Sequence, residues 1–327
     1  MKTKQWHLVD EQQIADLYST TIADFWSANV TQSHFLGKDG VTIHYAFSIP
    51  EKAKSSIVLS NGRIETLIKY KEFIYECFVN DIAVFTMDHR GQGLSGRMTL
   101  DPQRGFVSQF SDYVEDLGQF VTDIVNPKVD TKPTLVCHSM GSAIGFLTAV
   151  KQPHLFKKVL LCSPMFGIKP TLPQPLLDLV LGFGLTANKL FGRRPWYAVG
   201  QHPYIDIPFA INTLTHSAVR YKLFREEYKS NPSTQLGGVT YQWLNEAIGA
   251  METISEQAPR FNLPTKVITS GSDKVVDNKK IAAVVAKMPN ADGFQIAGAR
   301  HELLFESDEY RQPAVKAIFE FVCEGKD

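Results

Sequence analysis

The sequence has few cysteines for its length. Its 327 residues include four, and none of them stands in the Cys-x-x-Cys spacing that is typical of zinc and redox sites. Cysteines so sparse and so far apart do not make the dense disulfide framework of a small secreted domain. We therefore expect free, buried thiols in a reducing compartment, at Cys77, Cys137, Cys162 and Cys323.

The sequence also lacks an excess of charge and a long apolar run. Lysine plus arginine and aspartate plus glutamate number 34 each, so electrostatic attraction does not favour a nucleic-acid partner. The longest apolar run, Pro175 to Leu185, contains Asp178 and is far shorter than the roughly 20 residues of a membrane-spanning helix. Lys2 and Lys4 precede a segment with acidic residues and no continuous apolar stretch, so we expect no signal peptide. These absences predict a soluble, cytoplasmic protein.

Near the N-terminus, apolar residues recur at helical spacing between Val9 and Trp26. Asp10 is a candidate N-terminal cap for this helix. The polar face carries aspartate and glutamate rather than lysine, which disfavours binding to an anionic lipid surface. We therefore expect the helix to pack against the rest of the protein.

Beyond this helix, the sequence alternates between strand and helix patterns. Residues 34–36 and 41–47 flank the turn-rich Gly37-Lys38-Asp39-Gly40 and predict a β-hairpin. Further strands are predicted at 57–59, 82–87, 133–137, 159–162, 266–269 and 293–296, and helices at 68–78, 111–124, 281–288 and 310–322. This alternation predicts an α/β fold, with a mostly parallel sheet and helices on both of its faces.

The alternation stops after Pro164. Seven of the 17 prolines lie between Pro164 and Pro208, and two helical patterns follow at 214–228 and 241–254. The strand and helix pattern resumes after Pro264. We therefore interpret residues 165–260 as a largely helical insertion into a single α/β core that consists of residues 1–164 and 261–327.

A candidate nucleophile lies in the stretch from Leu135 to Gly145. A β-branched, apolar approach leads into the turn His138-Ser139-Met140-Gly141 and then into small residues that suit a helix packed closely on a sheet. This is the layout of a nucleophile elbow, in which a strained turn exposes a serine hydroxyl. We predict that Ser139 is an acyl-transfer nucleophile; the alternative is that it only caps the helix. Cys137 replaces the usual leading glycine.

A serine nucleophile needs a base, and the base needs an acid that holds its tautomer. In α/β-hydrolases the order along the chain is Ser, then Asp or Glu, then His, each after a strand. Asp273 and His301 follow predicted strands in this order, and parallel strands end at the same edge of the sheet. Asp277 is the alternative acid if Asp273 caps the next helix. We expect His138, next to the serine, to be structural.

The oxyanion formed on attack requires preorganised N–H donors. The usual pair is the amide after the nucleophile and an amide in the loop after an early strand. We assign these roles to the backbone N–H groups of Met140 and Arg63, because Gly62 lets the loop after residues 57–59 turn toward the site.

A glycine motif, Gly91-Gln92-Gly93-Leu94-Ser95-Gly96, matches the pattern of dinucleotide binding and follows a strand. The residues after it do not predict a helix, whose N-terminus a bound pyrophosphate would need. We therefore expect a tight loop beside the active site and no nucleotide cofactor.

Five segments together resemble the bacterial lysophospholipase L2 branch of the monoacylglycerol-lipase-like α/β-hydrolases. They are residues 61–65, 88–96, 138–141, 273–278 and 301–306, and the resemblance extends from about residue 56 to the C-terminus. It implies a serine hydrolase without metal or cofactor that cleaves one acyl ester through an acyl-enzyme, beneath a cap formed by the insertion. The substrate would be a lysophospholipid or a monoacylglycerol. A thioesterase or small-ester esterase is the alternative enzyme, and a non-catalytic lipid-binding or interaction protein is the alternative of another class.

A lipid ester requires an apolar channel for its acyl chain. Candidate lining residues in the insertion are Phe166, Leu177, Val180 and Phe183, and Arg193 is a candidate contact for a phosphate head group. Alternatively, the apolar residues bury each other and the arginine is only solvated. The cap would also allow peripheral contact with the inner face of the membrane. No protein partner is inferred.

Overall fold

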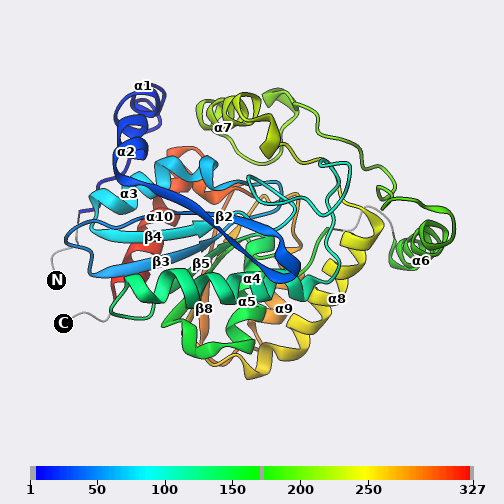
Figure 1. Cartoon of the computed structure of the whole chain (residues 1–327). Coiled ribbons are helices and arrows are strands. Elements are labelled where there is room, and N and C mark those ends of the chain that lie inside the picture. The colour runs from blue at the N-terminus through cyan, green and yellow to red at the C-terminus, as the bar shows by residue number, and fades with distance from the viewer. Residues whose placement is uncertain (1–4, 170–172, 325–327) are drawn as a thin grey trace.

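A single eight-stranded sheet forms the centre of the computed structural model, which describes residues 5–169 and 173–324. Within these residues the strand order is β1-β2-β4-β3-β5-β6-β7-β8 (Figure 1). The strands are β1 (Thr31–Leu36), β2 (Thr42–Ser48), β3 (Ser55–Ser60), β4 (Ile82–Met87), β5 (Thr134–His138), β6 (Lys158–Cys162), β7 (Thr265–Ser270) and β8 (Ala291–Ile296). Strand β2 is antiparallel to β1 and β4, and every other pair is parallel. The predicted hairpin and mostly parallel sheet are confirmed.

Helices cover both faces of the sheet (Figure 1). One face packs against α4 (Phe110–Gln119), α5 (Met140–Lys151), α8 (Tyr241–Gln257) and α9 (Asn278–Val285). The other packs against α2 (Thr21–Asn29), α3 (Lys71–Val79) and α10 (Asp308–Cys323). Every residue of β3, β4, β5 and β6 is buried, which explains why these strands are apolar or small in sequence except at His138 and Lys158, at the ends of β5 and β6.

The N-terminal helix differs from its prediction in two ways. It consists of α1 (Ile14–Ser19) and α2, separated at Thr20, whose φ of −119° and ψ of −95° are not helical. Asp10 does not cap it, because the N-cap residue of α1 is Gln13. The packing prediction is confirmed, since Ile14 and Ile22 are fully buried.

Among the described residues of the predicted insertion, one helix was not predicted from the sequence pattern, α6 (Gln174–Phe191). Pro175 lies in its first turn, where proline is tolerated because the backbone N–H has no partner within the helix. Figure 1 shows α6 at the periphery of the molecule, distant from α7 (Ala218–Ser230). Helix α8, by contrast, packs on α4 and α5, where Trp243 Nε1 donates to the Tyr113 hydroxyl at 3.2 Å.

Across residues 5–169 and 173–324, none of the helices combines the length and the apolar character that crossing a bilayer requires.

Candidate active site

Ser139 lies in a strained turn between β5 and α5. Its φ of 51° and ψ of −118° place a non-glycine residue in a sparsely populated region, as a nucleophile elbow requires. The end of β6 holds the turn, since the Ser139 N–H donates to the Cys162 carbonyl at 3.0 Å. The serine hydroxyl makes no capping hydrogen bond to α5 and lies 2.9 Å from Nε2 of His301.

Two glycines of α5 explain how the turn fits between its neighbours. A side chain at Gly141 would collide with the backbone carbonyls of Ser60 and Asn61, so glycine lets the helix approach the loop after β3. A side chain at Gly145 would collide with the sulfur of Cys137. The thiol that replaces the usual leading glycine therefore occupies space that Gly145 leaves open, and the strained turn is retained.

His301, in the loop after β8, contacts both the serine and one aspartate. Its Nδ1 lies 2.7 Å from Oδ2 of Asp273, and both side chains are buried. Asp273 also accepts hydrogen bonds from the backbone N–H groups of Val275 and Val276, at 2.7 and 3.0 Å. Burial raises the pKa of Asp273, but His301 and the two amides lower this pKa by more than burial raises it. The net shift is therefore downward, and the carboxylate is ionised.

The alternative acid, Asp277, has a different use. Its carboxylate accepts hydrogen bonds from the backbone N–H groups of Lys279 and Lys280, at 2.9 and 3.4 Å, and so caps α9. Of the two aspartates, the one that contacts the histidine is therefore Asp273.

Two backbone amides near the serine have no acceptor. Met140 N–H, at the start of α5, and Arg63 N–H, in the loop after β3, donate to no group within the described part of the chain. Met140 is buried and Arg63 is half-buried, and an amide that is shielded from water without a partner is costly unless a ligand completes it. These are the two amides that the sequence assigned to an oxyanion hole.

A buried cluster of charged side chains adjoins this site, and the sequence analysis missed it. Lys69 lies 2.8 Å from both Glu65 and Glu302, and the ring of His138 lies between Glu65, at 3.1 Å, and the backbone carbonyl of His301, at 3.2 Å. The cluster is electrically balanced when His138 is protonated, since two cations then face two carboxylates. The ring of His138 therefore supports the loop that carries His301.

The protonation of His138 makes the stability of this cluster dependent on pH. Burial lowers the pKa of the ring, and the charge of Lys69 also opposes protonation. Glu65 and Glu302 raise this pKa by more than these two effects lower it, so the net shift is upward. The protonated ring stabilises the fold fully below the ordinary histidine pKa of about 6.5, and this contribution is lost as the pH rises through the higher folded-state pKa. We expect the urea midpoint of the protein to fall as the pH rises through this folded-state pKa, and to fall less in a His138→Gln variant. Parallel curves for the two proteins would contradict the assignment.

The loop that carries His301 is tied to the insertion. The Glu302 N–H donates to the Leu214 carbonyl at 3.0 Å, and the Arg300 side chain donates to the Thr215 carbonyl at 2.8 Å. Glu306 accepts from the Arg300 N–H at 2.7 Å, which closes the loop on itself. The segment that precedes α7 therefore holds the histidine loop in place.

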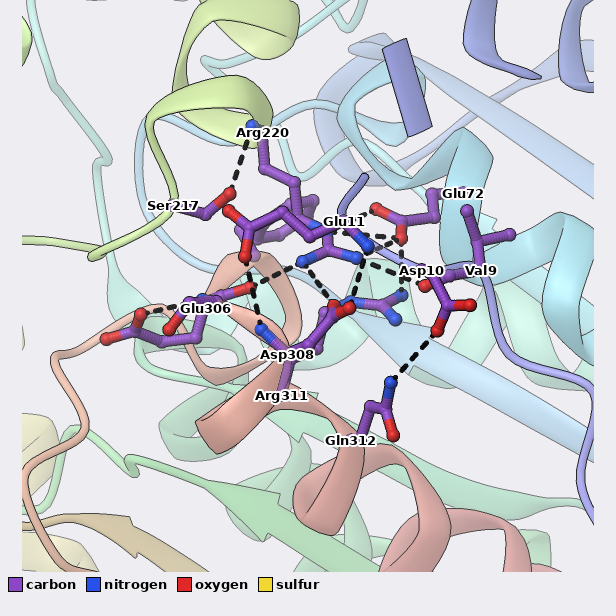
Figure 2. A network of polar contacts seen from close by, with 12 residues as sticks. Val9, Asp10, Glu11, Glu72, Ser217, Arg220, Glu306, Asp308, Arg311 and Gln312 are labelled. Carbon is purple, nitrogen blue, oxygen red and sulfur yellow. Dashed lines mark hydrogen bonds and ion pairs between the residues drawn. The ribbon is translucent and has the colours of Figure 1, made fainter. Parts of the chain in front are cut away.

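Helix α7 is itself anchored by Arg220. Figure 2 shows side chains from the N-terminal segment, α3, α7 and α10 meeting around this residue. Its guanidinium lies 2.9 Å from Glu72 and 2.8 Å from Asp308, and it donates to the carbonyls of Glu306 and Val9. Only 2% of Arg220 is exposed. The anchor is thus a buried ion-pair network that joins α7 to α3, to α10 and to the N-terminal segment.

Replacement of Arg220 by methionine is expected to destabilise the protein by about 3–5 kcal/mol, because Glu72 loses its bidentate partner while it stays buried. The free energy of unfolding in urea measures this change. Lys222→Met is the matched control, because that lysine pairs with Glu226 in solvent and its loss is expected to change stability by less than ~0.5 kcal/mol. Equal effects of the two substitutions would contradict the anchoring role.

The residues proposed to bind substrate are dispersed. Phe166 is buried against the ring of Phe146, with ring centroids 5.5 Å apart. On α6, Leu177 and Val180 are half-buried and Phe183 is 75% exposed. Arg193 is exposed after the end of α6. Their contact with a substrate stays a prediction.

The glycine motif at residues 91–96 forms a closed turn. Gly91 N–H donates to the Gly96 carbonyl at 2.9 Å, and the buried carboxylate of Asp88 accepts from the Leu94 N–H at 2.7 Å. No helix begins in the described chain between β4 and α4, so the motif does not present a helix N-terminus to a phosphate.

Comparison with known proteins gives consistent results. The model of the serine aminopeptidase S33 family matches residues 51–308. Lysophospholipase L2 of Escherichia coli K12 is 34% identical over an alignment of 326 residues, which covers 97% of this chain and 94% of that protein. Rat monoglyceride lipase is 26% identical, over 87% of this chain and 88% of that protein. A crystal structure of a soluble variant of monoglyceride lipase from Saccharomyces cerevisiae, in complex with a substrate analogue, superposes with a TM-score of 0.70 at 15% identity, over 92% of this chain and 97% of that one.

Proposed function

Because the chain belongs to the serine aminopeptidase S33 family of α/β-hydrolases, we propose that it cleaves the ester of a single-acyl lipid, a lysophospholipid or a monoacylglycerol. The observation that carries this proposal is the continuous chain of hydrogen-bonding contacts from Ser139 Oγ to His301, at 2.9 Å, and from His301 to Asp273, at 2.7 Å. The names of two groups of relatives, lysophospholipase L2 and monoglyceride lipase, support the substrate class.

The proposed reaction has two stages. His301 removes the proton of Ser139 as its oxygen attacks the ester carbonyl, and then gives this proton to the departing alcohol, which leaves an acyl-enzyme. A water molecule, activated by the same histidine, releases the fatty acid. Asp273 holds the tautomer of His301 and stabilises its cationic form, while the amides of Met140 and Arg63 stabilise the oxyanion.

Residues 165–260 are proposed to form a cap that contacts the membrane surface through α6. Large apolar side chains recur on one side of this helix, where Leu179 is 68% exposed and Leu190 is 68% exposed. Lys189, Arg193 and Arg194 at its C-terminal end suit anionic lipid head groups. Sedimentation with anionic vesicles is expected to carry down the wild-type protein but not a Leu179→Glu, Leu190→Glu variant. Equal sedimentation of the two would exclude α6 as the contact.

A substrate panel tests the proposed function. Rates are compared for lysophosphatidylcholine, monoacylglycerol, acyl-CoA and a short p-nitrophenyl ester, and the two lipids are expected to give the highest kcat/KM. Preference for acyl-CoA would identify a thioesterase, and turnover of the short ester alone would identify a small-ester esterase. Lipid binding without turnover of any of the four would identify a binding protein.

A further inference from the structure

The side chain of Arg63 is a guanidinium without a carboxylate. Its Nη2 donates to the Gly237 carbonyl at 2.6 Å, and its Cζ lies 5.2 Å from the ring centroid of Trp243. Its Nε is sealed from solvent and has no hydrogen-bond partner among the described residues, none of which offers a carboxylate at ion-pair distance. Buried arginines elsewhere in the protein are paired: Arg90 with Asp116, Arg104 with Asp101, Arg220 with Glu72 and Arg311 with Glu76.

This isolation has an energetic consequence. Burial lowers the pKa of Arg63 to about 10, and the two groups that oppose the change are phenols, Tyr113 and Tyr197, rather than carboxylates. A desolvated cation without a counter-ion is unfavourable. An anionic ligand that supplies the missing negative charge is therefore bound strongly.

A second unpaired polar group lies in residues 165–260, and two adjacent residues connect it with Arg63: Gly105 lies against the Arg63 guanidinium and Arg104 lies against the Tyr197 ring. The hydroxyl of Tyr197 is buried and has no hydrogen-bond partner within the described chain. Burial and Asp101 raise the pKa of this phenol, while the charges of Arg104, Arg63 and Arg194 oppose the rise. The guanidinium of Arg104 lies 4.5 Å from the centroid of the Tyr197 ring. Among the described residues, Asp101 is the one carboxylate that acts on this phenol, so positive charge exceeds negative charge around Tyr197.

The position of Arg63 links this group to the reacting ester. Its backbone N–H is one of the two proposed oxyanion donors. The number of covalent bonds from that nitrogen to Cζ equals the number from the ester carbonyl carbon of a 1-acyl lysophospholipid to its phosphorus. The Arg63 side chain is therefore long enough for its guanidinium to contact the phosphate of a lipid that lies along it with the ester carbonyl at the Arg63 N–H. A monoacylglycerol has only a hydroxyl at this end.

We propose that the Arg63 guanidinium and the Tyr197 hydroxyl form a phosphate-ester recognition site at the seam between the loop after β3 and the insertion. The site rests on the proposed function and refines it, because it selects a single-acyl phospholipid over a neutral monoacylglycerol. A guanidinium suits this role, since its planar fork offers two parallel donors to phosphate oxygens.

The first test compares two substrates that differ only in the phosphate, 1-acylglycerol 3-phosphate and the 1-monoacylglycerol with the same acyl chain. The ratio of their kcat/KM values is used, because any effect of a substitution on the shared ester chemistry cancels. We expect this ratio to fall about 10- to 100-fold in Arg63→Gln and about fivefold in Tyr197→Phe. Arg260→Gln removes a charge from an exposed site before β7, at the opposite edge of the sheet, and is the matched control. A ratio in Arg63→Gln equal to that of the wild type would overturn the proposal.

A second test uses the wild-type protein and does not depend on the folding of a variant. Glycerol 3-phosphate is expected to inhibit hydrolysis of a short p-nitrophenyl ester competitively, and more strongly than inorganic phosphate does. Glycerol is expected not to inhibit. Equal inhibition by glycerol 3-phosphate and inorganic phosphate would identify a site for free phosphate instead of a lipid head group. Absence of inhibition would overturn the site. Turnover of the p-nitrophenyl ester is measured in the same assay, so failure of this inference is distinguished from failure of the proposed function.

Discussion

Replacement of Ser139 by alanine is expected to lower kcat for ester hydrolysis by about 10⁴-fold or more. The loss follows from removal of the oxygen that lies 2.9 Å from His301 Nε2, since no other serine hydroxyl contacts that nitrogen within the described chain. Stability is expected to change little, because the hydroxyl does not cap α5 and alanine keeps the same backbone strain. Steady-state kinetics on a short p-nitrophenyl ester and thermal unfolding measure the two effects.

Ser142→Ala provides the matched control for this prediction. Ser142 lies one turn further along α5, is fully buried, and its hydroxyl has no partner among the described residues. Its removal is expected to leave kcat within about twofold of the wild type, because it touches none of the reacting groups. Turnover by Ser139→Ala above about 1% of the wild-type rate would show that another residue is the nucleophile.

Replacement of Asp273 by asparagine is expected to lower kcat by about 10⁴-fold, because an amide stabilises the wrong tautomer of His301 and does not balance the imidazolium. Asp277→Asn is expected to retain near wild-type activity, because asparagine caps a helix about as well as aspartate does. Comparison of the two variants shows which of the two aspartates, both candidates from the sequence, is the acid that holds His301.

The same kinetic assay measures both variants, and circular dichroism checks that each is folded. If Asp277→Asn lost activity while Asp273→Asn kept it, the contact of Asp273 with His301 at 2.7 Å would be structural and the assignment of the acid would be reversed.

The sheet was predictable because each of its central strands is buried on both faces, and apart from His138 and Lys158 at strand ends these strands consist of apolar or small residues. The break at Thr20 was not, since apolar residues continue at helical spacing on both sides of it. Helix α6 was missed because Pro173 and Pro175 suggest a loop, although proline suits a first helical turn.

The geometry of the site was predictable in part. Ser139, Asp273 and His301 meet because parallel strands deliver them to one edge of the sheet, which chain order alone indicates. The cluster of Lys69 and its two glutamates was not predictable, because charged residues are ordinarily exposed and Glu302 is distant from Lys69 in sequence. Contacts of the insertion depend on tertiary packing that no local pattern encodes.

The central claim is that Ser139 is an activated nucleophile, and reaction with a fluorophosphonate tests it most directly. Intact-mass analysis followed by peptide mapping is expected to find one adduct, on the peptide that contains Ser139. Prior heat denaturation and competition by a lysophospholipid are both expected to prevent it, because the reaction requires the folded contact with His301. A folded protein that gains no adduct, or that gains one at a different serine, would contradict the account.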